Sequence, residues 1–267
     1  MVTTHFVRRD DTAIAYDRWG SGDALVLLHA GLGDRRMWDD QSYALGARFE
    51  VIRVDARGFG ETRQTETSYS SVDDVLAVLD DCGIQQSHVL GLSMGSATAL
   101  AFALAHPTRM RSLILVGAGI GVPASPTLRA NWAEVDRLME DGKIDDANEL
   151  EMQMWFDGPT RAPENVNSAA RQRLADMNRA LLTRDDAFDS EFSPVPPVEE
   201  RLGDIGCPTL VMWGDSDIDR VQEAGPMLTQ KLPNAKSMVL KNTAHIPNME
   251  HPAMFNALVL EFLSGLE

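Results

Sequence analysis

The sequence predicts an α/β protein in which a mostly parallel sheet is flanked by helices and interrupted by a helical insertion. Short apolar runs alternate with helical patterns through the first 117 residues, which is typical of parallel strands joined by crossover helices. From Pro123 to about Pro197 the pattern is helical throughout, and strand-like runs then resume. We therefore divide the chain of 267 residues into a first core part (1–120), a helical insertion (121–197) and a second core part (198–267).

Strands are predicted where apolar runs end at glycine or at polar residues. The segment TAIAYDRWG alternates apolar and polar side chains, as a strand with one exposed face does. Continuous apolar runs are typical of strands buried on both faces of a parallel sheet. These runs are ALVLLHAG (24–31), FEVIRVDARG (49–58), SHVLGLS (87–93), RSLILVGAG (111–119), CPTLVMWG (207–214) and AKSMVLK (235–241).

Helices are predicted between these strands. Ser71 and Asp74 form a capping-box pattern, apolar residues then repeat at helical spacing, and Gly83 ends the helix. Residues 94–105 are rich in alanine and leucine, which favours a helix directly after the strand at 87–93. A last helix is expected from about Pro252.

The insertion has its own helical pattern, and SPVPP (193–197) is expected to be the linker that leads back to the sheet. The first helix of the insertion has an apolar face made of Leu128, Trp132, Val135 and Leu138. Most methionine and tryptophan side chains here should pack the insertion onto the sheet, and a few should line an apolar pocket. The residues expected to line a substrate pocket are Leu32, Trp132, Met154, Trp155 and Ile246.

The charge of the chain excludes some classes of partner. The 40 acidic and 24 basic residues give a formal charge of −16, which repels phosphate backbones and anionic headgroups. We therefore expect neither a nucleic acid nor a membrane surface as partner. No apolar stretch approaches the ~20 residues of a membrane span, and the first residues lack the apolar segment of a signal peptide, so a cytoplasmic protein is expected. The oligomeric state is left open.

No cofactor or metal is expected. The two cysteines, Cys82 and Cys207, belong to no CxxC or Cys/His cluster, so neither a disulfide framework nor zinc is indicated. The stretch GAGIG (117–121) follows a strand, but the third glycine of a dinucleotide-binding motif would fall on Val122. A nucleotide site is therefore not indicated.

Three segments that can carry chemistry follow three predicted strands. Ser93, in GLSMGS, ends one strand; GDSDID (214–219) follows the first strand after the insertion; His245 follows the last strand. Parallel strands present their carboxyl ends at one edge of a sheet, so these segments should meet. A serine hydroxyl needs a base and a third group that orients the base, and His245 with a carboxylate of 214–219 would supply both. Asp215, Asp217 and Asp219 all remain candidates for that carboxylate.

The glycines beside Ser93 suit a tight turn from strand to helix. Gly91 and Gly95 let backbone pass close by while the serine occupies a strained conformation. The helix that begins there directs free N–H groups at developing negative charge, so the N–H of Met94 is an expected oxyanion donor. A second donor should come from HAGLG (29–33), at the end of an earlier strand.

Five segments together resemble the α/β-hydrolase superfamily: LLHAGLGDRRMWDDQ, VIRVDARGFGET, GLSMGS, PTLVMWGDSD and AHIPNMEHP. The resemblance covers nearly the whole chain outside the insertion, which is itself similar to the cap of that superfamily. It implies an eight-stranded, mostly parallel sheet with a helical cap at 121–197. It also implies Ser93 as nucleophile, His245 as base and Asp217, the second aspartate of its loop, as acid.

The resemblance further implies two backbone oxyanion donors, the N–H groups of Met94 and Gly31. The sequence departs from the superfamily at Ala30, where glycine is usual, so Leu32 is the alternative to Gly31 as second donor. The stretch around HAGLGD also looks like enol-lactone hydrolases.

Hydrolysis of a carboxylic ester or lactone through an acyl-enzyme on Ser93 is the predicted reaction, with a small molecule as substrate. Carbon–carbon bond hydrolases of the superfamily often carry Asn before the serine, where this chain has Leu92. That reaction, a cofactor-free perhydrolase and a non-hydrolytic lyase remain alternatives. A different class also remains open, namely a small-molecule receptor of slow turnover. A serine nucleophile argues against dehalogenase and epoxide hydrolase activity.

Overall fold

The computed structural model of the chain describes residues 3–64, 68–185 and 198–266. Its strands form an eight-stranded sheet in the order β1-β2-β4-β3-β5-β6-β7-β8. The first two strands pair antiparallel, β2 also runs antiparallel to β4, and every later pair is parallel. The bounds are β1 Thr4–Arg9, β2 Thr12–Gly20, β3 Asp23–Leu28, β4 Phe49–Val54, β5 Ser87–Leu92, β6 Met110–Val116, β7 Thr209–Gly214 and β8 Ala235–Leu240.

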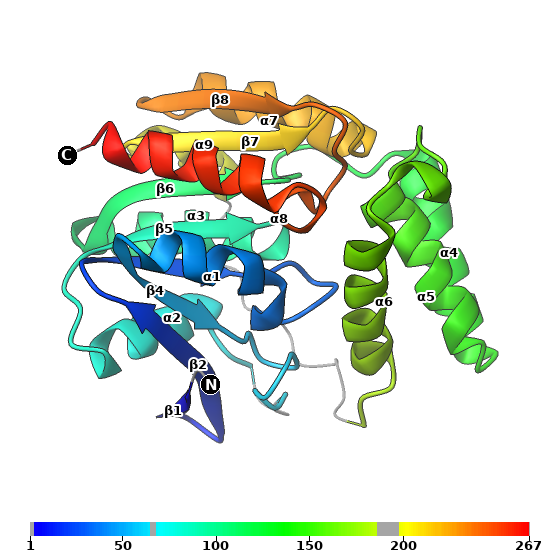
Figure 1. The fold of residues 1–267 in the computed structure, drawn as a ribbon, viewed down its shortest axis with the longest axis horizontal. Coiled ribbons are helices and arrows are strands. Elements are labelled where there is room, and N and C mark those ends of the chain that lie inside the picture. The colour runs from blue at the N-terminus through cyan, green and yellow to red at the C-terminus, as the bar shows by residue number, and fades with distance from the viewer. Residues whose placement is uncertain (1–2, 65–67, 186–197, 267) are drawn as a thin grey trace.

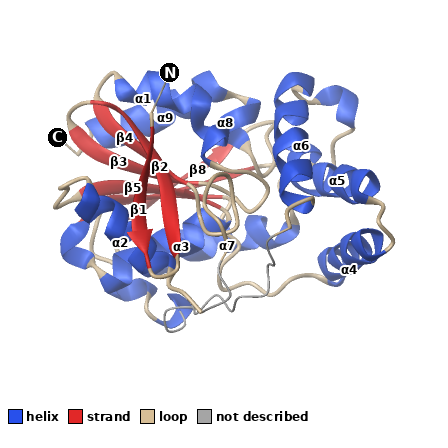
Figure 2. Cartoon of the chain, turned by 90° about the horizontal axis from the view of Figure 1, so that it is seen from below, coloured by secondary structure: helices blue, strands red, loops and turns tan. Residues whose placement is uncertain are grey.

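Helices cover both faces of the sheet (Figure 2), so this is the predicted α/β class. One face carries α2 (Ser71–Asp81), α3 (Met94–Ala105) and α7 (Asp219–Lys231). The other face carries α1 (Asp39–Gly46) and α9 (Pro252–Ser264), with the short α8 (Pro247–Glu250) before α9. The three-layer arrangement leaves the ends of the strands free to hold a site.

Burial along β3 shows why a continuous apolar run forms a central strand. Leu25 and Leu27 pack into the core beneath α1 and α9, whereas Val26 and Leu28 pack into the core beneath α2 and α3. Successive side chains of a strand point to opposite faces, so both faces of β3 must be apolar when helices cover both. The same reasoning applies to β5, whose residues are all buried.

The cap lies at the carboxyl ends of the strands (Figure 1). It contains α4 (Pro126–Glu140), α5 (Ile144–Met152), a π-helical turn at Gln153–Asp157 and α6 (Ser168–Leu182). These helices fall within the insertion predicted at 121–197. The predicted linker SPVPP (193–197) lies outside the described residues. The position of the cap places it over the edge of the sheet at which Ser93, Asp217 and His245 were expected.

Two local predictions are wrong. Ser70, not Ser71, caps α2, since the Ser70 side chain accepts a hydrogen bond from the N–H of Asp73 and Ser71 is already helical. Trp132 does not lie on the buried face of α4 but is 36% exposed. The buried stripe passes through Leu128, Val135 and Leu138 with the half-buried Asn131 between them, and Trp132 lies one position, or about 100°, around the helix.

Besides the short α8, the strand β1 and the helices α1 and α7 were not predicted from the sequence. The strand β1 has mostly exposed side chains, so its sequence THFVRR lacks a clear apolar alternation. The helices α1 and α7 have many polar residues and no strong start signal. β1 forms by pairing with β2, and α1 and α7 form by packing on the sheet, and a local pattern records neither.

Candidate active site

Ser93 occupies the sharp turn between β5 and α3. Its φ of +54° and ψ of −109° lie in a region that non-glycine residues rarely adopt. Such a conformation costs on the order of 1–3 kcal/mol and persists only where the surroundings enforce it. One enforcing contact is the hydrogen bond from the N–H of Ser93 to the carbonyl of Val116, 2.8 Å long, at the end of the neighbouring strand β6.

The two glycines that flank Ser93 have no room for a side chain. A Cβ on Gly91 would lie 2.1 Å from the carbonyl oxygen of Gly95, and a Cβ on Gly95 would lie 2.2 Å from the carbonyl oxygen of Leu28. The N–H of Gly95 also donates to the carbonyl of His29 at 3.1 Å. Close backbone packing therefore fixes the Ser93 turn against the loop that follows β3.

Gly95→Ala is expected to lower the free energy of unfolding by about 4 kcal/mol or more, because its Cβ would meet backbone that cannot move aside. Gly203→Ala serves as the control, since a Cβ there has no neighbour within 4 Å. Urea denaturation measures both variants. A Gly95→Ala protein as stable as Gly203→Ala would contradict the close packing of this turn.

His245 and Asp217 meet at the same edge of the sheet. His245 Nδ1 lies 2.9 Å from Asp217 Oδ2 and 3.1 Å from Oδ1, and both residues are buried, with 2% and 4% of their surface exposed. Asp217 Oδ1 also accepts the N–H of Ile218 at 2.7 Å. The carboxylates of the two other candidates accept backbone N–H groups elsewhere, Asp215 that of Asn242 and Asp219 that of Arg220. Asp217 is therefore the carboxylate that orients the imidazole.

The backbone brings His245 beside the Ser93 turn. A Cβ on Gly117 would lie 3.0 Å from His245 Cε1, and Gly117 directly follows Val116, which accepts the N–H of Ser93. Nε2 of His245 is buried and has no hydrogen-bond partner among the described residues. No hydrogen bond joins it to Ser93 Oγ in the described part of the chain, and such bonds are often long in ligand-free sites.

The expected oxyanion donors also lie together. Met94 is the first residue of α3, and its N–H has no acceptor among the described residues. A Cβ on Gly31 would lie 3.9 Å from Met94 Sδ, so the loop after β3 borders the start of α3. The N–H of Ala30 already donates to Met37 Sδ at 3.3 Å, which leaves Gly31 and Leu32 as the candidates in this loop.

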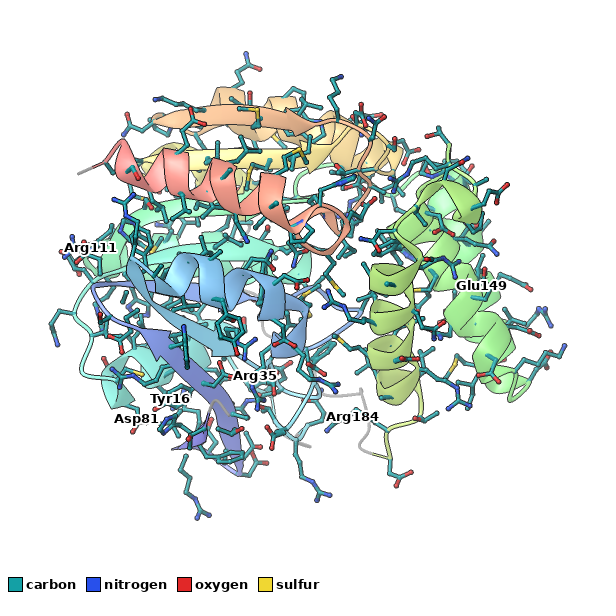
Figure 3. All side chains as sticks on the ribbon, viewed as in Figure 1. Tyr16, Arg35, Asp81, Arg111, Glu149 and Arg184 are labelled. Atoms are coloured by element: carbon teal, nitrogen blue, oxygen red, sulfur yellow. The ribbon has the colours of Figure 1, made fainter. Side chains whose placement is uncertain are left out.

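Buried ion pairs hold this loop in place. The Arg35 side chain, labelled in Figure 3, contacts Asp55, Asp17 and Glu61. Asp55 Oδ1 also accepts the backbone N–H of Arg35 at 2.8 Å. Burial raises the pKa of Asp55, and Arg35 opposes that shift. Asp55 thus has a structural role.

The predicted pocket residues fall in different places. The ring of Trp155 lies 4.7 Å from that of His245 between centroids, so Trp155 borders the imidazole directly. Ile246 is fully buried in the core beneath α1 and α9, and Leu32 is 6% exposed in the same core. Neither Ile246 nor Leu32, nor the exposed Trp132, lines the cavity described next. Leu32 and Ile246 pack into the core, and the assignment of all three residues to a substrate pocket stays a prediction.

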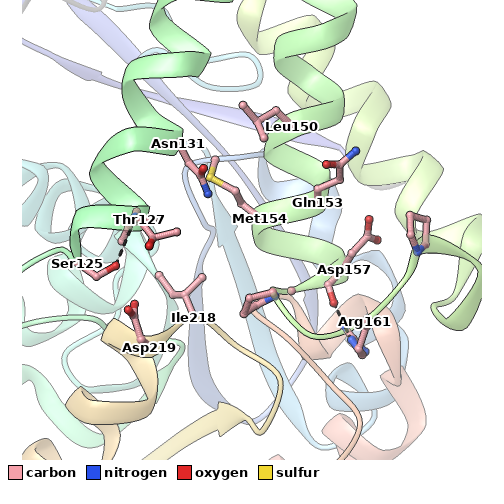
Figure 4. A pocket seen from close by; sticks show the side chains of 14 residues that line it. Ser125, Thr127, Asn131, Leu150, Gln153, Met154, Asp157, Arg161, Ile218 and Asp219 are labelled. Carbon is pink, nitrogen blue, oxygen red and sulfur yellow. Dashed lines mark hydrogen bonds between the residues drawn. The ribbon is translucent and has the colours of Figure 1, made fainter.

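A cavity of about 680 Å³ lies between α4, the π-helical turn and the loop after β7 (Figure 4). Met154 is the one predicted pocket residue that lines it. The other lining side chains include Leu128, Asn131 and Ile218, and Ile218 directly follows Asp217. Ser93 and His245 are not lining residues, so the cavity adjoins the acid loop rather than the nucleophile.

Sequence reasoning missed two charged residues near the His245 loop, Arg161 and Glu250. Glu250 is 3% exposed, and its carboxylate accepts the N–H of Ala244 at 2.7 Å. A carboxylate in the short segment that follows His245 is a signal that the sequence does contain. Arg161 lies in an irregular part of the cap, and no pattern there indicates its partner.

No group of three or more His, Cys, Asp or Glu within the described residues is arranged to hold a metal ion. Among the described residues, no helix is both long enough and apolar enough to span a bilayer.

The sheet order, the turn at Ser93 and the cap above the strand ends together define an α/β hydrolase. Residues 23–252 match the family described as alpha/beta hydrolase fold, and the chain belongs to that family.

Curated relatives and solved structures cover nearly the whole chain. A 2-hydroxy-6-oxononadienedioate/2-hydroxy-6-oxononatrienedioate hydrolase of Burkholderia vietnamiensis is 31% identical, over 94% of this chain and 90% of its own. The structure of Est816, titled as an N-acyl homoserine lactone degrading enzyme, is 25% identical with a TM-score of 0.80, over 97% of this chain and 100% of its own. The enol-lactonase of Burkholderia xenovorans, 23% identical with a TM-score of 0.80 over 97% and 100%, shares the fold.

Proposed function

We propose that the protein is a serine hydrolase that cleaves a carboxylic ester or lactone through an acyl-enzyme on Ser93. The observation that carries this proposal is the buried His245, whose Nδ1 is held by Asp217 and whose Nε2 has no partner among the described residues. A base with one nitrogen fixed and the other free beside a strained serine turn is the arrangement that nucleophilic catalysis needs.

In the proposed mechanism, Ser93 Oγ attacks the carbonyl carbon while His245 Nε2 takes the hydroxyl proton. Asp217 keeps the proton of the neutral imidazole on Nδ1 and stabilises the imidazolium that forms. The N–H of Met94 and that of either Gly31 or Leu32 stabilise the oxyanion. Nε2 then gives its proton to the leaving alkoxide, and it later activates the water that releases the acid.

The charges around the cavity favour an uncharged substrate. Arg161 is the arginine among the described lining residues, and its guanidinium is bound by Glu250 and by carbonyl groups. The buried Asp157 is paired with Arg171. Because the lining Arg161 is already paired with Glu250, it is not free to bind the carboxylates of a dianionic substrate, whereas a neutral ester or lactone needs no such partner.

Hydrolysis of a carbon–carbon bond is the second candidate. The observation in its favour is that curated relatives between 27% and 31% identical are named as hydrolases of 2-hydroxy-6-oxononadienedioate. The same Ser93 and His245 would serve that reaction. That named compound carries two carboxylates, whereas the cavity arginine of this chain is already paired.

One experiment compares the two candidates. Purified protein is given a short-chain nitrophenyl ester, a neutral lactone and 2-hydroxy-6-oxononadienedioate, and turnovers per active site are counted for each. A fluorophosphonate probe with peptide mapping locates the reactive residue. We expect repeated turnover of the ester or lactone and one adduct on Ser93. Faster turnover of the dioate would favour the second candidate, and an unlabelled Ser93 in folded protein would refute both.

Met154→Ala is expected to raise the KM of a medium-chain ester roughly 10-fold, since lost apolar contacts in a pocket have effects of this size. Trp132→Ala is the matched control, because this cap side chain is 36% exposed and does not line the cavity. Steady-state kinetics with esters of two to eight acyl carbons give the comparison. If both variants keep the wild-type KM for every ester, the cavity does not hold the acyl chain.

A further inference from the structure

The loop that carries His245 is held at two consecutive backbone amides. The N–H of Ala244 donates to Glu250 Oε1 at 2.7 Å, within the core domain. The N–H of His245 donates to the carbonyl of Trp155 at 3.2 Å, which belongs to the cap. The base is therefore supported from both parts of the protein.

Arg161 joins these two supports. Its Nη1 donates to Glu250 Oε2 at 2.6 Å and to the carbonyl of Asn242 at 2.8 Å, both on the side of the His245 loop. Its Nε and Nη2 each donate at 2.7 Å to carbonyls of the cap, those of Asp157 and Phe156. One largely buried guanidinium thus links the two residues that follow Trp155 to Asn242, before His245 in the chain, and to Glu250, after it.

The π-helical turn explains why these carbonyls are available. The last carbonyls of a helix have no partner within it, and the turn ends at Gly158, where φ is +77°. A Cβ on Gly158 would lie 2.3 Å from the carbonyl oxygen of Ser216 and 2.9 Å from Ala244 Cβ. The end of the turn therefore packs tightly between the loop that carries Asp217 and the loop that carries His245.

We propose that Arg161 and Glu250 form a positioning pair that fixes the position of His245 relative to Ser93. Through this pair, the position of His245 depends on the position of the cap. The proposal rests on the proposed function, in that His245 is taken as the base. Neither residue touches the reacting atoms. Their effect is on the placement of the imidazole, and a displacement of about 1 Å can cost a rate factor on the order of 100.

The test compares Glu250→Gln, Arg161→Lys and the double variant with Arg171→Gln. Arg171 is the matched control because it too is a largely buried cap arginine, and it pairs with Asp157 and with Glu149 on the outer face of the cap (Figure 3). Within the described residues it makes no hydrogen bond or ion pair with the His245 loop. Measured for each protein are kcat and KM for one ester, the rate of fluorophosphonate labelling and the melting temperature.

For Glu250→Gln and Arg161→Lys we expect kcat and the labelling rate to fall together, by roughly 10- to 100-fold, with little change in KM. Arg171→Gln should lower the melting temperature and leave kcat within about 3-fold. The double variant should lose no more than the worse single variant, because the two residues act as one unit.

Two results would overturn the proposal: single variants that keep kcat within 3-fold while folded, or losses that Arg171→Gln reproduces. If Glu250→Gln does not fold, the same criteria apply to Arg161→Lys, which keeps the charge and loses carbonyl contacts. Failure of the proposed function is separate, since wild-type protein would then show neither turnover nor a Ser93 adduct.

Discussion

Replacing Ser93 with alanine is expected to lower kcat for the best ester by about 10⁵-fold. Removal of a nucleophilic serine commonly costs 10⁴- to 10⁶-fold, and what remains comes from binding and the oxyanion donors. The variant should keep its fold, because the Ser93 turn is enforced by backbone contacts of its neighbours rather than by the hydroxyl. Circular dichroism and substrate binding should therefore be unchanged.

The control for Ser93→Ala is Ser216→Ala, another loop hydroxyl at this edge of the sheet, which should retain nearly full activity. Activity is followed by initial rates and adduct formation by intact mass. If Ser93→Ala retains more than about 1% of the wild-type kcat, the acyl-enzyme mechanism is wrong, whatever the probe labels.

Asp217→Asn is expected to lower kcat by about 10⁴-fold, the size known for loss of the orienting carboxylate in other triads. Asp217 Oδ1 accepts the N–H of Ile218, so an asparagine would keep its oxygen there and turn its amide N–H₂ toward His245 Nδ1. The imidazole proton would then move to Nε2, and the nitrogen that must accept the serine proton would already carry one.

Asp215→Asn should change kcat less than 3-fold. Its carboxylate accepts the N–H of Asn242, and an asparagine oxygen can accept the same bond. Initial rates of the two variants at one pH give the ranking. The reverse ranking would mean that the loop adopts another register in solution and that Asp215 orients the base.

The central part of the fold could be predicted because strands that are buried on both faces have continuous apolar sequences. The apolar runs at 87–93 and 111–119 became β5 and β6, and residues 94–105 became α3 with the same bounds. The placement of Ser93, Asp217 and His245 at one edge then followed from the chain order of the strand ends. Their roles stay proposals.

Other features could not be predicted because they depend on distant contacts. Three of the four residues of the apolar pattern on α4 are buried, whereas Trp132, at the edge of this face, is 36% exposed, which the local pattern does not record. Leu32 and Ile246 were placed in a pocket because they adjoin the expected site in sequence, yet their side chains turn into the core. Arg161 contacts Asn242 and Glu250, which lie 81 and 89 residues further along the chain. A local hydrophobic pattern carries no information on pairs so far apart.

The carbonyl of Trp155 that supports His245 bears on how specificity could be exchanged between relatives. A chimera that received a whole foreign cap would also receive a foreign acceptor for the amide of the base, so its rate could fall even where the new pocket fits the substrate. The transferable parts are α4, α5 and α6. The stretch from Gln153 to Arg161, although it lies between them in the chain, would have to be inherited with the core.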